Sequence, residues 1–228
     1  MEFLTLKNVV KSYGQTKVLK GVSLHLNKGE LCVMLGPSGC GKSTLLNIIG
    51  GIDSCDEGEI LVDGKDISQM KEKDLTKYRR NHLGYIFQMY NLIPNLTVRE
   101  NIEVGAYLSG EPLDINALLQ TLGLYDHQNK LPHQLSGGQQ QRTSIGRAVI
   151  KNPTFLLCDE PTGALDYKTS KDILKLLEEI NEKYGTTILM VTHNDALAQM
   201  ADRIIHIKDG EIISDQRHEK VSIDKIEW

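Results

Sequence analysis

The stretch from Gly36 to Thr44 combines residue types that can hold a chain of phosphates. It fits a spacing of glycine, four free positions and Gly-Lys-Ser. Glycines let consecutive backbone N–H groups turn toward one anion, Lys42 adds a positive charge, and Ser43 offers a hydroxyl to Mg2+. We therefore predict a nucleotide phosphate-binding loop, formed by Gly36, Pro37, Ser38, Gly39, Cys40, Gly41, Lys42, Ser43 and Thr44.

The residues on either side of this loop favour the same interpretation. The apolar run 31–35 predicts a buried strand, and the run 45–49 predicts an apolar helix. The N-terminus of such a helix directs its positive dipole end toward a bound anion. A chance glycine-rich turn is the alternative, and it would not require this strand and helix.

Three more apolar runs end in polar residues that suit phosphate chemistry. The runs and the residues that follow them are 83–87 with Gln88, 155–158 with Asp159 and Glu160, and 188–192 with His193. In open α/β sheets, ligands bind beyond the carboxyl ends of the strands. If the strands lie side by side, all four ends meet at one nucleotide.

The chemistry of these residues suggests a role for each. Asp159 should help to hold the Mg2+ ion that bridges the outer phosphates, and Glu160 should act as the general base on the attacking water. Gln88 can contact Mg2+ or that water, while His193 can donate a hydrogen bond to the terminal phosphate. Taken singly, Gln88 or His193 could equally be an ordinary strand-end side chain, so the prediction rests on the whole group.

A second candidate anion site lies at Ser136, Gly137, Gly138 and Gln139. Ser136 is a natural N-cap, and two glycines at a helix N-terminus leave bare N–H groups for an anion. Because the chain already has one phosphate loop, we expect these residues to cover the nucleotide held by another copy. Tyr13, in a predicted loop, could stack on an adenine, although spacing alone favours a half-buried tyrosine at a sheet rim.

The rest of the chain predicts an α/β fold with a mainly parallel sheet. Short strand-like runs in 3–26 predict an N-terminal antiparallel β layer, and Asp-Gly turns at 63–64 and 209–210 predict two hairpins. The region 89–149 lacks strand alternation and is predicted to be an inserted helical subdomain. We therefore expect a single nucleotide-binding domain over 1–228, with a core of 1–88 and 150–213 and a loosely held polar tail at 214–228.

Composition narrows the possible functions. The formal net charge is -4, so no basic field indicates nucleic-acid binding. The apolar runs are far shorter than the roughly 18 residues that a membrane helix needs, and the N-terminus does not resemble a secretory signal. The four cysteines show no metal spacing, which suits a reducing compartment and points to the cytoplasm.

The run Leu135-Ser136-Gly137-Gly138-Gln139, together with the phosphate loop, resembles the ATP-binding-cassette ATPases over about 3–213. The resemblance implies a head-to-tail dimer that holds two ATP molecules with Mg2+, each site completed by the partner's Ser136, Gly138 and Gln139. It also implies adenine stacking by Tyr13, a switch role for His193 and a linking role for Asp166. No motif is missing, so both sites should be active.

The finer resemblance is to ATPase subunits of macrolide export, lipoprotein release and antimicrobial-peptide resistance. It rests on 48–53, on 87–97 and on Pro161-Thr162-Gly163-Ala164-Leu165-Asp166, where Ala164 is more like the peptide-resistance group. It implies that the chain has a transmembrane permease as its partner and is located on the cytoplasmic side of the cell membrane. It also implies a possible periplasmic or extracellular adaptor. The alternatives are a cassette that signals or acts in division, a DNA-associated cassette and a small-molecule kinase.

Overall fold

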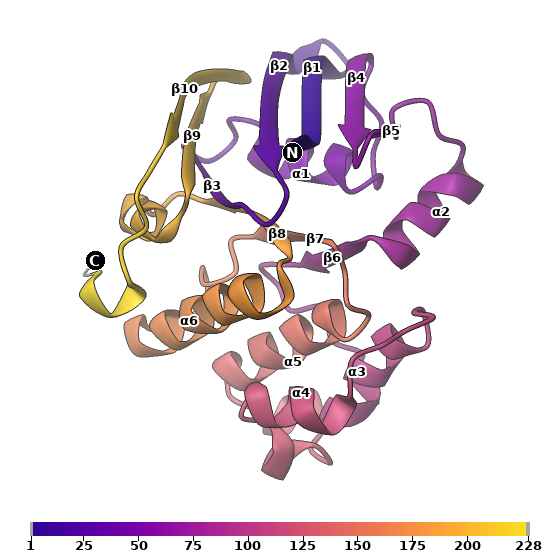
Figure 1. The fold of residues 1–228 in the computed structure, drawn as a ribbon, viewed down its shortest axis with the longest axis vertical. Helices are drawn as coiled ribbons and strands as arrows, with labels where there is room; N and C mark the ends of the chain where they lie inside the picture. The colour runs from indigo at the N-terminus through magenta and orange to yellow at the C-terminus, as the bar shows by residue number, and fades with distance from the viewer. Residues whose placement is uncertain (1, 227–228) are drawn as a thin grey trace.

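Two β-sheets frame the computed structural model, which describes residues 2–226 (Figure 1). The antiparallel sheet has the order β2 (Thr16–Asn27), β1 (Glu2–Tyr13), β4 (Glu57–Val62) and β5 (Lys65–Asp66). The larger sheet has the order β10 (Glu211–Arg217), β9 (Arg203–Lys208), β3 (Leu31–Leu35), β8 (Thr187–Thr192), β7 (Phe155–Asp159) and β6 (Leu83–Ile86).

The larger sheet is parallel except at one edge. Strand β3 pairs in parallel with β8 and β9, β7 pairs in parallel with β8 and β6, and only β10 runs antiparallel to its neighbour β9. This arrangement confirms the predicted α/β fold with its antiparallel N-terminal layer. It also places the four strands that end in chemistry side by side, in the order β3, β8, β7, β6.

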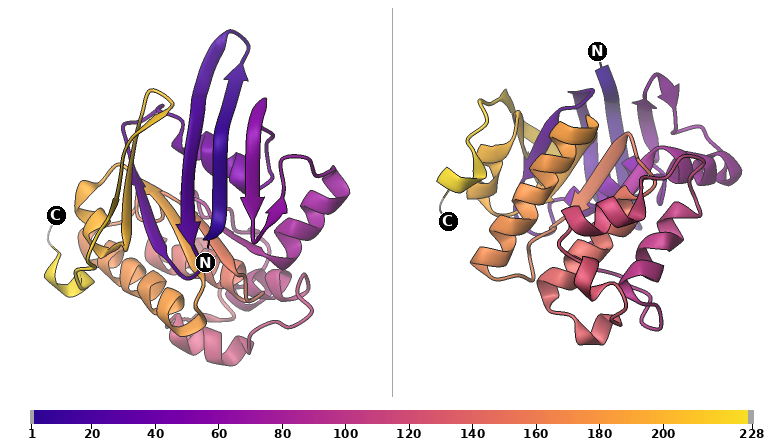
Figure 2. Two further views of the ribbon diagram at one scale, coloured as in Figure 1. Left: turned by 45° about the horizontal axis from the view of Figure 1, so that its top comes forward. Right: turned by 60° about the horizontal axis from the view of Figure 1, so that its bottom comes forward.

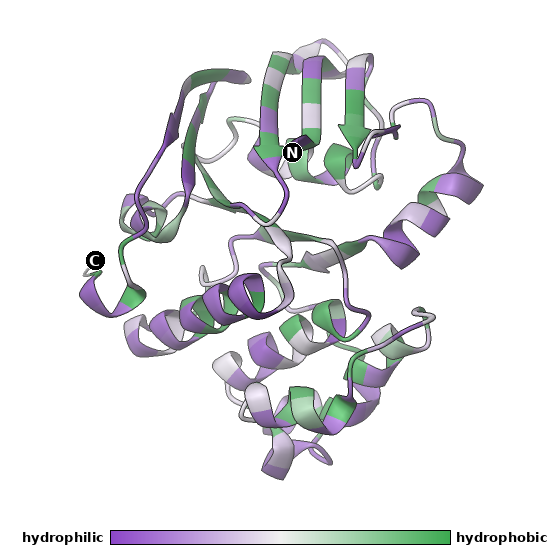
Figure 3. Ribbon diagram, in the orientation of Figure 1, coloured by the Kyte–Doolittle hydropathy of each residue, from purple (hydrophilic) through white to green (hydrophobic). Residues whose placement is uncertain are grey.

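The parallel sheet is buried on both faces. Leu31, Val33 and Leu35 of β3 pack into a core with the helices of the inserted region, whereas Cys32 and Met34 pack into a second core with α1 and the antiparallel sheet. Because side chains alternate across a strand, one continuous apolar run serves both cores. Figure 3 shows this strand as hydrophobic and the helix α6 as banded.

The helices follow the expected order along the chain. They are α1 (Lys42–Ile49), α2 (Glu72–Asn81), α3 (Val98–Ala106), α4 (Ile115–Thr121), α5 (Gly137–Val149) and α6 (Tyr167–Tyr184), with 3-10 turns at 125–127, 132–134, 195–200 and 223–225. Between β6 and β7 the described residues form helices and loops only, and α3, α4 and α5 group together away from the antiparallel sheet (Figure 2). None of the helices within residues 2–226 is long and apolar enough to cross a membrane.

Helix ends match the sequence signals. Thr97 caps α3 in a capping box with Glu100, Asp114 caps α4, and Gly185 ends α6 in the left-handed conformation. The cysteines Cys32, Cys40 and Cys158 are buried, and none of the four is in a disulfide among the described residues.

The expectation of a loosely held tail from Ser214 onward is wrong for residues 214–226. Strand β10 continues to Arg217, and the side chains of Ile223 and Ile226 are 1% exposed. They pack in the same core as the apolar face of α6, and Asp224 forms an ion pair with Lys175. The prediction failed because the tail is mostly polar and charged. Its isoleucines Ile223 and Ile226 nevertheless bury apolar surface against the core.

Candidate functional site

The phosphate loop joins β3 to α1 in a backbone path that requires glycine. Gly41, the N-cap of α1, has a φ of 105° and is left-handed. A Cβ atom on Gly36 would lie 2.3 Å from the carbonyl oxygen of Ile207, so no larger residue fits there. The structure thus places the loop against β9, with the N-terminus of α1 facing it.

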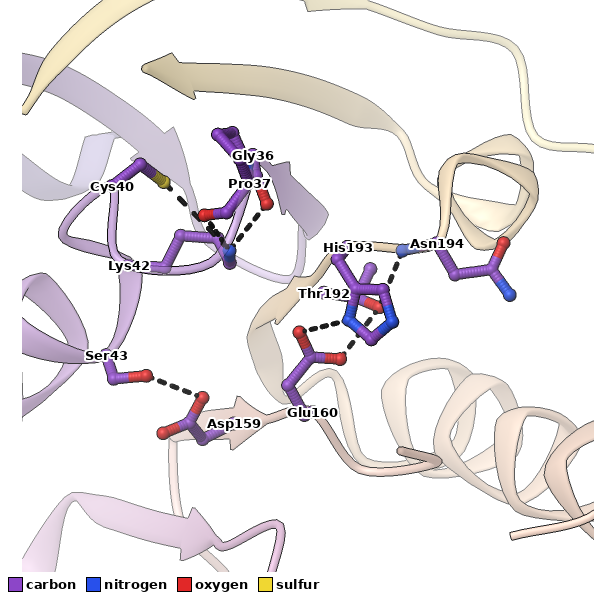
Figure 4. Close-up of polar contacts among 10 residues, drawn as sticks. All are labelled: Gly36, Pro37, Cys40, Lys42, Ser43, Asp159, Glu160, Thr192, His193 and Asn194. Carbon is purple, nitrogen blue, oxygen red and sulfur yellow. Dashed lines mark hydrogen bonds and ion pairs between the residues drawn. The ribbon is translucent and has the colours of Figure 1, made fainter. Parts of the chain in front are cut away.

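Lys42 points back into this loop. Its side-chain ammonium donates to the carbonyl oxygens of Gly36 at 2.6 Å and Pro37 at 3.0 Å, and the residue is 7% exposed. The charge is therefore held against the backbone turn of the loop. This geometry suits a phosphate chain seated in the loop (Figure 4).

Ser43 and Asp159 form a pair of oxygen ligands beside the loop. The Ser43 hydroxyl donates to Oδ1 of Asp159 at 3.1 Å, across a sequence separation of 116 residues. No group of three or more His, Cys, Asp or Glu side chains in the described residues could hold a metal by itself. Two hard oxygen donors next to a phosphate loop fit Mg2+, which takes its other ligands from phosphates and water.

The pKa of Asp159 is raised. Burial is the main cause and the Glu160 carboxylate adds to it, while the Ser43 hydroxyl and the Lys42 charge oppose it. A raised pKa means that this carboxyl takes up a proton at a higher pH than an ordinary aspartate would.

We predict that Asp159 binds Mg2+, and the Mg2+ concentration that gives half-maximal turnover should then depend on pH. Only the ionised carboxylate binds Mg2+, so the Mg2+ concentration for half-maximal activity should rise as pH falls. This rise should begin above the range in which an ordinary aspartate titrates, near a pKa of about 3.9. Steady-state assays across pH, with circular dichroism to monitor folding, measure it. A Mg2+ requirement that stays constant down to that range would contradict the assignment.

Glu160 lies next to Asp159 in an uncommon backbone conformation. Its φ is 46°, in the left-handed region that non-glycine residues rarely occupy, and its N–H donates to the Val191 carbonyl at 3.0 Å. Strained residues of this kind are held by their surroundings and cluster at functional sites. The strain directs the carboxylate toward the end of β8.

Two residues at the end of β8, Thr192 and His193, orient this carboxylate. His193 Nδ1 lies 2.8 Å from Oε1 of Glu160, and the Thr192 hydroxyl donates to Oε2 at 3.1 Å. The Glu160 side chain is 14% exposed, whereas that of His193 is 63% exposed. Contacts at both oxygens thus hold the carboxylate in one orientation (Figure 4).

Gln88 follows β6 at the same edge of the sheet as Asp159 and His193, but its side chain lies beside the turn at Gly163. A Cβ atom on Gly163 would lie 3.1 Å from its Nε2 atom, so its amide neighbours the turn after Glu160. No hydrogen bond in the described residues joins Gln88 to Ser43 or Asp159. Its role as a Mg2+ ligand remains a prediction.

Tyr13 is the last residue of β1 rather than part of a loop, and it is 50% exposed. Its hydroxyl contacts Asp53 and interacts with the Thr44 side chain of the phosphate loop. Tyr13 therefore lies at the rim of the sheet and close to the phosphate loop. This position fits a half-buried rim tyrosine and also a residue that stacks on adenine.

The second candidate anion site, at Ser136 to Gln139, is separate from these groups within one chain. Ser136 caps α5: its Oγ accepts from the Gln139 N–H, and the Gln139 amide oxygen accepts from the Ser136 N–H. Asp166 caps α6 by accepting from Thr169. In the described residues no hydrogen bond or ion pair connects these caps to the phosphate loop.

Two further residues belong to the site although their sequence positions do not reveal it. Thr192 orients Glu160, and only its place as the last residue of an apolar run hinted at this. Gln141 is 1% exposed, and its Nε2 donates at 2.7 Å to the carbonyl of Pro161, next to Glu160. This bond ties α5 to the turn that holds Glu160.

A phosphate loop, an acidic strand end and a held glutamate on one parallel sheet define a P-loop ATPase. A family model described as ABC transporter matches residues 19–163. The chain belongs to the ABC transporter family, and within it to the ATP-binding subunits.

Named relatives support this assignment over most of the chain. The lipoprotein-releasing system ATP-binding protein LolD of Bacteroides fragilis is 40% identical, over 91% of this chain and 99% of its own length. The bacitracin export ATP-binding protein BceA of Halalkalibacterium halodurans is 42% identical, over 93% and 87%.

Other matches are longer proteins. The chain spans 46% and 50% of the length of two putative ABC transporter ATP-binding proteins from Mycoplasma pneumoniae and Mycoplasma genitalium, which are 50% and 47% identical. Among solved structures, the dimeric ATP-binding cassette MJ0796 bound to ADP and Pi superposes with a TM-score of 0.87 at 40% identity. That match covers 96% of this chain and all of the other.

Proposed function

We propose that this chain hydrolyses ATP as one half of a head-to-tail dimer and thereby drives a membrane-embedded permease. The observation that carries the proposal is the alignment, at one sheet edge, of the phosphate loop, the Ser43–Asp159 pair and the Glu160–His193 pair. The dimeric state of the solved relative bound to ADP and Pi supports it.

The chain's own residues would divide the hydrolytic step as follows. Lys42 and the loop N–H groups hold the phosphates, and Ser43 and Asp159 hold Mg2+, which offsets phosphate charge when bound. Glu160 removes a proton from the attacking water, while Thr192 fixes its second oxygen. His193 orients Glu160 through Nδ1 and leaves Nε2 for the terminal phosphate.

The partner chain would complete each site. The capped end of α5, with Ser136, Gly137, Gly138 and Gln139, offers two N–H groups and the positive end of a helix to an anion. Asp166 would lie at the same junction, because α6 begins beside α5. A Cβ atom on Gly138 would lie 2.3 Å from Cγ2 of Thr169, so the two helix ends are in close contact.

A groove of about 390 Å³ provides a surface for the permease. It lies between the core sheet and the helical region, and its lining includes Ile52, Tyr85, Phe87 and the side chains of Arg79, Leu108, Arg147 and Lys151. Arg147 donates to the carbonyls of Tyr90 and Asn91, which connects the groove to the segment after Gln88. The apolar floor and basic residues fit a short permease helix with apolar and acidic side chains.

The docking assignment predicts a selective loss. Ile52→Glu places a charge in the groove, so it should abolish co-purification with the permease and leave ATP hydrolysis by the isolated chain unchanged. Ile213→Glu is the matched control, since both isoleucines are exposed, at 52% and 63%, but Ile213 lies on β10. Pull-down from detergent-solubilised membranes measures the effect. If both variants co-purify with the permease equally well, the groove is not the docking surface.

We propose that the driven process is export or efflux, and that the cargo is an antimicrobial compound, a peptide or a lipoprotein. This proposal draws on the functions for which the LolD and BceA relatives are named. It places the chain on the cytoplasmic side of the membrane, with an adaptor on the other side. The test is to purify the chain from its native membrane and identify what co-purifies. A polytopic permease supports the proposal, whereas recovery of the chain without any membrane protein contradicts it.

A further inference from the structure

Tyr13 is held at two points by charged neighbours. Its hydroxyl donates to Oδ2 of Asp53, and the ammonium of Lys11 lies over its ring, 5.1 Å from the centroid. Lys11 also donates to Oδ1 of Asp53 at 2.8 Å and to the Ser54 carbonyl at 2.6 Å. One carboxylate therefore holds both the Tyr13 hydroxyl and the Lys11 ammonium that lies over the ring.

This cluster links the end of β1 to the helix that follows the phosphate loop. Lys11 and Tyr13 are two residues apart on β1, so they share one face of the strand. Asp53 lies just after α1, and the N–H groups of Ile52 and Asp53 donate to the carbonyl of Asn47 within that helix. Through Asp53, the position of Tyr13 is thereby coupled to α1, the helix that begins at Lys42.

The charges in the cluster support a fixed geometry. Burial alone would raise the pKa of Asp53, but hydrogen bonds from Lys11 and Tyr13 outweigh it and hold that pKa below its ordinary value. The hydrogen bond to Asp53 raises the pKa of Lys11. An ionised carboxylate only accepts hydrogen bonds, so the Tyr13 hydroxyl must point toward it.

We infer that Asp53, held by Lys11, is a positioning residue that fixes Tyr13 as a platform for the adenine base. This inference rests on the proposed stacking of ATP on Tyr13. Tyr13 as a residue is 50% exposed although Lys11 lies over its ring, and we place the base against this exposed surface. A ring already fixed in place loses less conformational freedom when a base stacks on it.

The test separates base binding from phosphate binding. Mg-ADP and pyrophosphate both occupy a phosphate loop, but only ADP carries the base. Base stacking contributes about 1–3 kcal/mol, so loss of about 1 kcal/mol of it should raise the Kd of ADP about fivefold. We expect this from Asp53→Asn and from Tyr13→Phe, which lacks only the hydroxyl and keeps the Lys11–Asp53 pair. Isothermal titration should show an unchanged pyrophosphate Kd.

Controls distinguish the possible failures. Glu59→Gln removes another ion pair of the same sheet, with Lys7 at 2.6 Å, and should change neither affinity. If Tyr13→Ala weakens ADP binding but Asp53→Asn and Tyr13→Phe do not, stacking stands and the positioning role is overturned. If Tyr13→Ala has no effect, the stacking proposal fails and the inference with it. Equal weakening of ADP and pyrophosphate binding would show a general effect on the loop and would also overturn it.

Discussion

Glu160→Gln is expected to abolish nearly all ATP turnover while ATP still binds. The change keeps the shape of the side chain and its acceptor for Thr192, but it removes the proton-accepting carboxylate. Loss of a positioned general base lowers rates by about 10²- to 10⁴-fold. Because hydrolysis would no longer reopen the dimer, the variant should accumulate as an ATP-bound dimer, which light scattering measures.

The control for this prediction is Glu211→Gln, an exposed carboxylate on β10. It should retain wild-type turnover and should not accumulate as a dimer. Near-normal turnover of Glu160→Gln would show that another group takes the proton. A variant that loses turnover yet stays monomeric with ATP would support the base and contradict the closed dimer.

Lys42→Ala should abolish turnover because it removes the charge at the centre of the loop. The lost ammonium bonds are to Gly36 and Pro37, so folding should be little affected and ATP affinity greatly reduced. Lys42→Arg should not restore activity, since a planar guanidinium does not replace a compact ammonium in a tight loop. Lys28→Ala, at an exposed turn residue, is the control. Normal Michaelis behaviour of Lys42→Ala would refute its role.

The arrangement of the strand ends could be predicted from the sequence because it depends on local patterns. Each apolar run is short, each is followed by a polar residue, and parallel strands present their carboxyl ends at one edge. The pairing of β3 with β8, and of β7 with β8 and β6, then brings Asp159, Glu160 and His193 together. The helix caps at Thr97 and Ser136 also depend only on residues close in sequence, because each capping box spans four positions.

The residues that the sequence did not reveal act over long separations. Lys11 and Asp53 are 42 positions apart, and Gln141 meets the carbonyl of Pro161 20 positions away. No periodicity or motif links such pairs, since their contact depends on how strands and helices pack. The packed tail was missed for the same reason, because the burial of Ile223 depends on α6.

In the proposed dimer, each nucleotide lies between the phosphate loop of one chain and α5 of another. Ser136→Asp should inactivate the chain by repelling phosphate across that junction, while an aspartate still caps α5. The neutral cap of Ser136→Asn should retain most activity, which controls for helix stability.

The most direct test mixes two inactive variants, Lys42→Ala and Ser136→Asp. A mixed dimer has one intact site, built from the loop of the Ser136→Asp chain and the α5 end of the Lys42→Ala chain. Mixing should restore turnover, to at most about a quarter of the wild-type rate for random pairing of independent sites. A mixture as inactive as its components, under conditions in which the wild-type chain dimerises, would contradict a site shared between two copies.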